Sequence, residues 1–137
     1  MDQGLVALVN EFRGQSVRVV GFAVNHRDAD RLPAMKEHSA KVGYNFTYVF
    51  DESQALGRAL GATRTPEYFV FDRSRKLVYM GLLTNSPAHR TMTGGISYVN
   101  GEPSVFYTAD AIRAALAGTP VAVPETRAQG CTVEYES

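Results

Sequence analysis

Residues 61–81 read G-A-T-R-T-P-E-Y-F-V-F-D-R-S-R-K-L-V-Y-M-G, and they decide the fold. Pro66 has no N–H to give to a sheet ladder, so within a sheet it belongs at the first residue of a strand or at an edge. The run Tyr68–Phe71 is apolar and rich in β-formers, which predicts a strand covered on both faces. A polar turn at residues 72–75 and a return strand at residues 76–80 complete a predicted hairpin over residues 67–81.

The composition describes one neutral domain. A length of 137 residues fits a single domain, residues 1–137. Fourteen basic and fourteen acidic side chains cancel, so no net charge favours nucleic acid or an anionic membrane surface. No window approaches the roughly 20 apolar residues that cross a bilayer, and the start of the sequence lacks the basic residues of a secretion signal. We therefore expect no nucleic-acid or membrane partner. The expected location is cytoplasmic by default, unless the true N-terminus precedes this sequence.

Before the proline, helical and strand patterns alternate. Apolar residues recur at helical spacing over residues 5–12, and Gly14 ends that segment. Residues 16–25 have a buried-strand pattern. A helix is expected at about residues 30–42, capped by Asp28 or Asp30. A short strand at residues 46–50 follows, and then a helix over residues 53–60. That second helix carries its apolar residues on one side: Ala55, Leu56, Ala59 and Leu60. The alternation predicts a mixed sheet with helices on its faces.

The second half of the chain is less regular. Residues 83–107 are expected to form a loop insertion or a small hairpin, in which residues 96–99 pair with residues 105–107 across N-G-E-P. Two irregular loop arms are an equally weighted alternative. Thr108 is expected to cap a helix that Gly118 ends. Residues 119–137 are predicted to be an extended C-terminal tail.

Four stretches carry a family resemblance: G-F-A-V-N at residues 21–25, F-T-Y-V-F-D-E-S-Q at residues 46–54, G-A-T-R-T-P-E-Y-F-V-F-D at residues 61–72, and A-L-A-G-T-P-V-A-V-P-E-T-R-A-Q-G-C at residues 115–131. In these stretches the chain resembles the thioredoxin-like redoxins of the alkyl hydroperoxide reductase and thiol-specific antioxidant group, which are related to peroxiredoxins. The resemblance implies a thioredoxin-like α/β fold, a mixed sheet flanked by helices.

One departure from that family lies at the front of the chain. The resemblance places a strand and a cysteine motif before the first helix, and this sequence starts too late to contain them. The missing strand is central in thioredoxin-like sheets. Its loss would leave two rows of backbone groups that must pair with each other, with another chain or with water. We therefore expect either an N-terminally truncated domain or a sheet that closes differently. Homo-oligomerisation through the incomplete sheet is also open.

The same resemblance points to candidate site residues. It implies a cis bond at Thr65-Pro66 and a substrate-binding backbone at Thr65, flanked by Arg64 and Pro66, where an extended peptide would add as a strand. The alternative is a proline that merely starts a strand. Cys131 is the only cysteine, and the resemblance makes it a candidate catalytic residue as a resolving or mixed-disulfide thiol. An ordinary tail cysteine is the preferred interpretation.

No cofactor and no metal are expected. The histidines, His26, His38 and His89, are scattered and lack zinc-site spacing.

Two function hypotheses remain. The first is a thiol-disulfide oxidoreductase or antioxidant domain that is inactive by itself, because the family's nucleophilic cysteine motif is absent. The one cysteine present supports only half of a thiol-exchange or peroxide-reduction cycle. Its partner would be a protein or peptide thiol or disulfide. The second is a non-catalytic module that binds an extended peptide at the Thr65-Pro66 corner.

Overall fold

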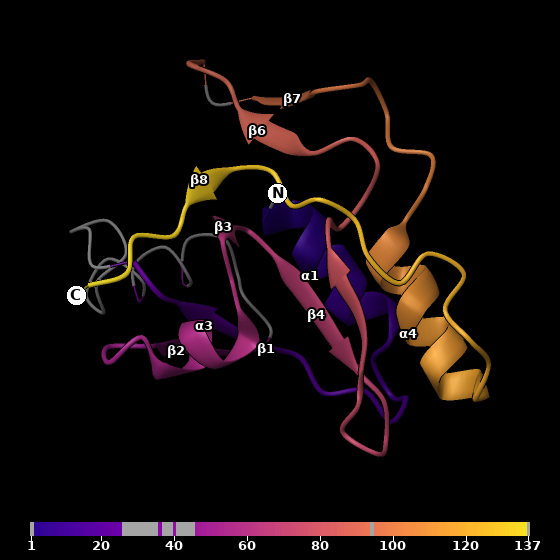
Figure 1. Cartoon of the computed structure of the whole chain (residues 1–137). Coiled ribbons are helices and arrows are strands. Elements are labelled where there is room, and N and C mark those ends of the chain that lie inside the picture. The colour runs from indigo at the N-terminus through magenta and orange to yellow at the C-terminus, as the bar shows by residue number, and fades with distance from the viewer. Residues whose placement is uncertain (1, 26–35, 37–39, 41–45, 94, 137) are drawn as a thin grey trace. The chain divides into compact units, whose positions relative to one another are not determined.

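The computed structural model describes residues 2–25, 36, 40, 46–93 and 95–136 (Figure 1). Contacts divide the chain into two compact units. The first unit contains Asp2–Thr63 and Thr132–Ser137, and the second contains Arg64–Cys131. Within the described residues, no helix is both long and apolar enough to cross a membrane.

The first unit holds a helix and a parallel pair of strands. Helix α1 spans Asp2–Glu11. Strand β1, Val20–Ala23, pairs in parallel with β2, Thr47–Phe50, so that Val20 lies opposite Thr47 and Ala23 opposite Phe50. Beyond the pair, the N–H of Asp51 donates to the carbonyl of Ala23 at 2.8 Å. The predicted helix and both predicted strands are confirmed. The first strand is shorter than expected, however, and Val20 is half exposed.

Helix α3, Ala55–Leu60, is also confirmed, but its predicted apolar side is wrong. Leu56 is 49% exposed, and the buried residue of this helix is Gly57. A Cβ at Gly57 would lie only 2.8 Å from Cγ1 of Val24, so this side of the helix approaches its neighbours through a residue without a side chain. The first turn is held by Asp51, whose Oδ2 accepts from the N–H of Gly57 at 2.9 Å. Close backbone approach, rather than side-chain hydrophobicity, thus decides which side of α3 faces inward.

The helix expected at residues 30–42 lies almost entirely outside the described residues. Lys36 and Ala40 are described, and both are helical. Its proposed caps, Asp28 and Asp30, lie outside the described part of the chain.

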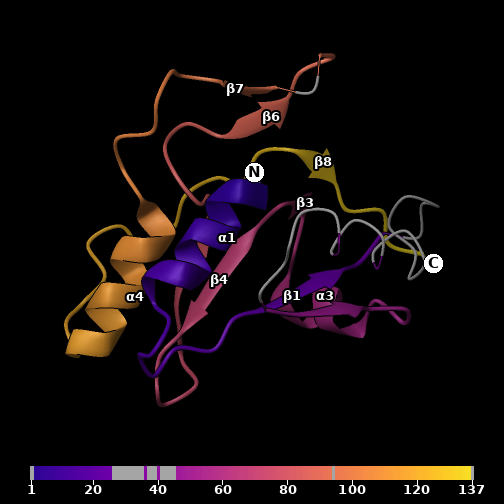
Figure 2. The ribbon, with the colours of Figure 1, turned by 180° about the vertical axis from the view of Figure 1, so that it is seen from behind.

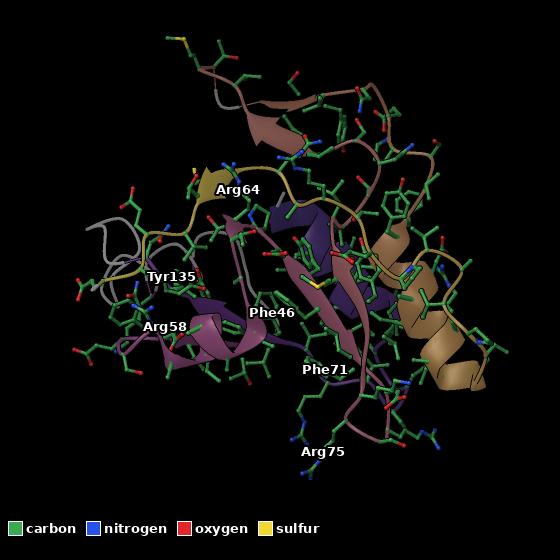
Figure 3. All side chains as sticks on the ribbon, viewed as in Figure 1. Phe46, Arg58, Arg64, Phe71, Arg75 and Tyr135 are labelled. Carbon is green, nitrogen blue, oxygen red and sulfur yellow. The ribbon has the colours of Figure 1, made fainter. Side chains whose placement is uncertain are left out.

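The second unit is built on the predicted hairpin. Strand β4, Tyr68–Phe71, pairs antiparallel with β5, Leu77–Gly81. Asp72 closes the turn, because its Oδ1 accepts from the N–H groups of Ser74 at 2.9 Å and Lys76 at 3.0 Å. Figure 3 shows Arg75 projecting from this turn. The expectation that β4 is covered on both faces is wrong, since Phe71 is 47% exposed. The pairing is irregular between Val70 and Phe71, next to the turn.

A second hairpin lies within residues 83–107, but its pairing differs from the one predicted. Strand β7, Ile96–Tyr98, pairs antiparallel with β6, Ala88–Arg90 (Figure 2). The Val105 segment is not a strand, because Asn85 occupies its backbone groups. The Asn85 N–H donates to the carbonyl of Val105 at 3.0 Å, and the Asn85 side-chain oxygen accepts from the N–H of Val105 at 3.1 Å.

Helix α4, Tyr107–Ala117, packs against β4 and β5 and ends at Gly118 as predicted (Figure 1). Thr108 is not its cap, contrary to prediction. Phe106 occupies the cap position without a side-chain bond, and Thr108 is buried inside the helix. The Thr108 hydroxyl donates to the carbonyl of Leu82 at 3.0 Å, so it ties the helix to the segment after β5.

Beyond α4, the predicted extended tail returns along β5. The N–H of Met80 donates to the carbonyl of Pro124 at 3.1 Å, and the N–H of Thr126 donates to the carbonyl of Met80 at 3.0 Å. The last strand, β8 (Cys131–Thr132), forms a two-stranded sheet with β3 (Arg64–Thr65). The tail is therefore extended and anchored.

Tyr79 anchors the tail from the core. It is 1% exposed, its hydroxyl donates to the carbonyl of Leu82 at 2.6 Å, and its oxygen lies 2.7 Å from Oγ1 of Thr126. Burial raises the pKa of the Tyr79 phenol. The neutral phenol is thus the form that the folded chain favours.

We expect this burial to cause a loss of stability in alkali. As pH rises above about 10, the unfolded chain releases this proton before the folded chain does, so the free energy of unfolding falls. Tyr79→Phe should cost about 1–2 kcal/mol at neutral pH, through the lost hydrogen bonds, and should flatten the decline above pH 10. Urea titrations between pH 8 and 11 measure both effects. Tyr98→Phe, on β7, is the control for removing a hydroxyl elsewhere. Equal pH slopes in wild type and Tyr79→Phe would contradict the assignment.

Candidate functional site

The proline corner joins α3 to the hairpin of the second unit. Arg64 is exposed, whereas Thr65 and Pro66 are half-buried, and the Thr65-Pro66 bond is cis, as the resemblance implied. Pro66 comes directly after β3 and before β4, where its missing N–H breaks no ladder. The corner therefore presents the backbone of Thr65 at a bend between two strands.

The C-terminal tail meets this corner at Gly130. A Cβ placed on Gly130 would overlap the carbonyl oxygen of Thr65 and would lie 3.4 Å from Cδ of Pro66. Gly130 also has a φ of +131°, a conformation that side chains disfavour. The Arg64 guanidinium donates to the carbonyl of Gly130 at 3.4 Å. Only glycine allows the tail this close to the corner.

Cys131 follows directly and is exposed. The structure therefore brings together Arg64, Thr65 and Pro66 with the backbone that carries Cys131, although these residues are more than sixty positions apart in the sequence. An accessible thiol beside an extended backbone can attack a disulfide sulfur of a bound peptide, or be attacked by a partner thiol. Figure 3 labels Arg64 beside β8.

Two contributions to this arrangement were missed from the sequence. Gly130 lies in one of the stretches that carry the resemblance, but its approach to Thr65 has no local signal apart from a glycine that precedes the cysteine. Thr126 was not singled out at all. Its Oγ1 accepts from the N–H of Leu82 at 2.8 Å, and a Cβ on Gly81 would overlap it. Thr126 therefore fixes the path of the tail four residues before Gly130.

The mixed α/β architecture and the proline corner define a protein of the thioredoxin-like class. A family model described as Redoxin matches residues 5–94. The chain belongs to the redoxin family, the thioredoxin-like group that includes the peroxiredoxins.

Two solved structures are similar to nearly the whole chain. A hypothetical protein from Sinorhizobium meliloti 1021 is 28% identical with a TM-score of 0.80, and the match covers 99% of this chain and 71% of that one. An uncharacterized conserved protein from Geobacillus kaustophilus is 30% identical with a TM-score of 0.75, with 98% and 68% covered. Among curated proteins, no significant match is found. These relatives support the fold and the family, and their names assign no activity.

Proposed function

We propose that this chain contributes the peptide-binding corner and one thiol to redoxin-type thiol-disulfide chemistry. An extended peptide that carries a disulfide or thiol binds beside Arg64, Thr65 and Pro66, and Cys131 reacts with it. The observation that carries the proposal is the approach of Gly130 to the carbonyl of Thr65, because it holds the only cysteine of the sequence at the corner.

The chemical step is a thiol-disulfide exchange. The Cys131 thiolate attacks one sulfur of the partner's disulfide. A new bond then forms between Cys131 and that sulfur, while the second partner sulfur leaves as a thiolate and takes a proton from water. A second thiol must attack the mixed disulfide to release the partner. The sequence supplies one cysteine, so that thiol comes from the partner or from an added reductant. By itself the chain is therefore expected to complete one exchange and to stop there.

The first test compares wild type with Cys131→Ser. In insulin-disulfide reduction with dithiothreitol, which supplies the second thiol, we expect wild type to exceed the uncatalysed rate and Cys131→Ser not to exceed it. With a disulfide-bearing peptide and no reductant, wild type should form one mixed disulfide per chain, detected by mass spectrometry, and Cys131→Ser should form none. Acceleration that Cys131→Ser retains, or a mixed disulfide that forms in neither protein, would contradict the proposal.

A second test asks whether the corner takes part. Exchange with the peptide disulfide should saturate with peptide concentration, because binding precedes reaction. Arg64→Ala should raise the half-saturating concentration several-fold, and it should leave the reaction with iodoacetamide unchanged. Arg73→Ala removes an exposed arginine of the β4–β5 turn and is the matched control. A rate that stays linear in peptide concentration would leave Cys131 as an ordinary exposed thiol.

A non-catalytic role is the second candidate. The pairing of the chain's own β8 with β3 supports this candidate, because β8 adds to the corner as an extended strand. If Cys131→Ser binds the same peptide with unchanged affinity, and no mixed disulfide forms in wild type, peptide binding alone is the function of the corner.

A further inference from the structure

The last residues of the chain are held by their main-chain groups. The N–H of Val133 donates to the carbonyl of Thr63 at 2.9 Å, and the N–H of Glu134 donates to Oδ1 of Asn25 at 2.8 Å. Nε2 of Gln54 donates to the carbonyl of Glu134 at 2.8 Å, and Oε1 of Gln54 accepts from the N–H of Glu136 at 2.8 Å. One side-chain amide thus bonds two backbone groups of an extended segment, as a neighbouring β-strand would.

This amide is built into the first unit. Gln54 is 1% exposed, and its Nε2 also donates to the carbonyl of Val24 at 2.9 Å. Asn25, which holds the N–H of Glu134, is 4% exposed. Buried amides are costly unless they are hydrogen-bonded. Part of the hydrogen-bonding capacity of Gln54 is used only when an extended segment lies against it.

Every second side chain of the tail, Val133 and Tyr135, packs against the first unit. Val133 is buried, whereas Glu134 and Glu136 are exposed. The Tyr135 hydroxyl donates to the carbonyl of Ala62 at 2.6 Å, and its ring lies under Arg58, with 4.7 Å between the guanidinium carbon and the ring centroid. Figure 3 shows Arg58 and Tyr135 side by side. The Arg58 guanidinium also donates to the carbonyl of Glu136.

Helix α3 leaves room for Tyr135 because it has a glycine, Gly57, at the point of contact. A Cβ on Gly57 would lie 3.1 Å from the Tyr135 hydroxyl oxygen. The contacts therefore select an extended segment with an apolar residue and, two positions later, a tyrosine, while the intervening residues point to solvent.

We propose that the residues contacting the tail form a recognition site for an extended partner segment of the pattern Val-x-Tyr-x. The partner segment binds there in exchange with the chain's own residues 133–136. The tail-binding surface consists of the side chains of Asn25, Gln54 and Arg58 and the carbonyls of Ala62 and Thr63. Main-chain contacts supply the affinity and the Val and Tyr positions supply the specificity. The site uses none of the residues that carry the proposed function.

The chain's own tail competes with any added peptide at a high effective concentration, so the test weakens that tail first. A full-length Tyr135→Ala chain is titrated into a fluorescein-labelled peptide of residues 132–137, T-V-E-Y-E-S, and binding is followed by anisotropy. We expect saturable binding by Tyr135→Ala and at least tenfold weaker binding by wild type. A peptide with alanine in place of tyrosine should bind Tyr135→Ala at least tenfold more weakly, whereas alanine in place of the first glutamate should change little.

The surface itself is tested in the same background. Adding Arg58→Ala to Tyr135→Ala should weaken peptide binding at least fivefold, and adding Arg13→Ala, an exposed arginine of the same unit, should not. Circular dichroism checks that each variant is folded. If Tyr135→Ala does not fold, Glu136→Pro frees the tail by removing the N–H that Gln54 accepts. Equal binding by wild type and the freed chain, or binding that ignores the peptide's tyrosine, would overturn the proposal.

Discussion

Gly130→Ala is expected to lower the free energy of unfolding by about 3 kcal/mol. The backbone would be strained, and the added methyl group would clash with the carbonyl oxygen of Thr65. Gly130 has a φ of +131°, and an added Cβ would overlap the carbonyl oxygen of Thr65. The tail cannot hold its path at the corner with that methyl group present. Urea unfolding followed by circular dichroism measures the loss.

Gly101→Ala provides the matched control in the same unit. Gly101 also has a positive φ, +76°, but a Cβ there would meet nothing within 4 Å. Its substitution should cost only the backbone strain, about 1 kcal/mol. Equal losses in the two variants would mean that the approach of Gly130 to Thr65 contributes nothing. In Gly130→Ala we also expect slower exchange between Cys131 and a peptide disulfide, with the rate of iodoacetamide alkylation preserved.

Gln54→Ala is the second change with a large expected effect, a loss of about 3 kcal/mol. It removes the partners of the Val24 carbonyl, the Glu134 carbonyl and the Glu136 N–H together, and each buried group left unsatisfied costs about 1–3 kcal/mol. Thermal and urea unfolding measure the total.

Two controls separate the causes. Gln54 has a φ of +61°, which alanine tolerates poorly, so Gln54→Gly shows the loss of the amide without that strain. Gln15→Ala removes an exposed amide of the same unit and should change stability by no more than about 0.5 kcal/mol. If Gln54→Gly were as mild as Gln15→Ala, the amide would not be holding the tail.

The candidate site was predictable only in part. A proline ahead of an apolar run identified the corner, because a residue without an N–H has few allowed places in a sheet. The resemblance supplied Arg64, Thr65, Pro66 and Cys131 as candidates, and the structure brings the tail that carries Cys131 to the corner. Gln54 was beyond sequence reasoning, because a glutamine before a short helix is typical of a solvated turn.

The sequence by itself determined the elements whose signals are local. Apolar periodicity and punctuation by glycine and proline were sufficient for α1, the β4–β5 hairpin and the end of α4 at Gly118. These patterns depend on the conformations of neighbouring residues, so they can be read along the chain.

Only the tertiary structure decided which long-range partners those elements take. Asn85 binds the backbone of Val105, so β7 pairs with β6 instead of the downstream arm. Gly57 faces inward on α3 although Leu56 is more apolar, because close backbone approach there leaves no space for a side chain. Gln54 holds residues 80 and more positions away. Hydrogen bonds and close approaches of this kind depend on where distant segments meet, and no local sequence pattern encodes that meeting.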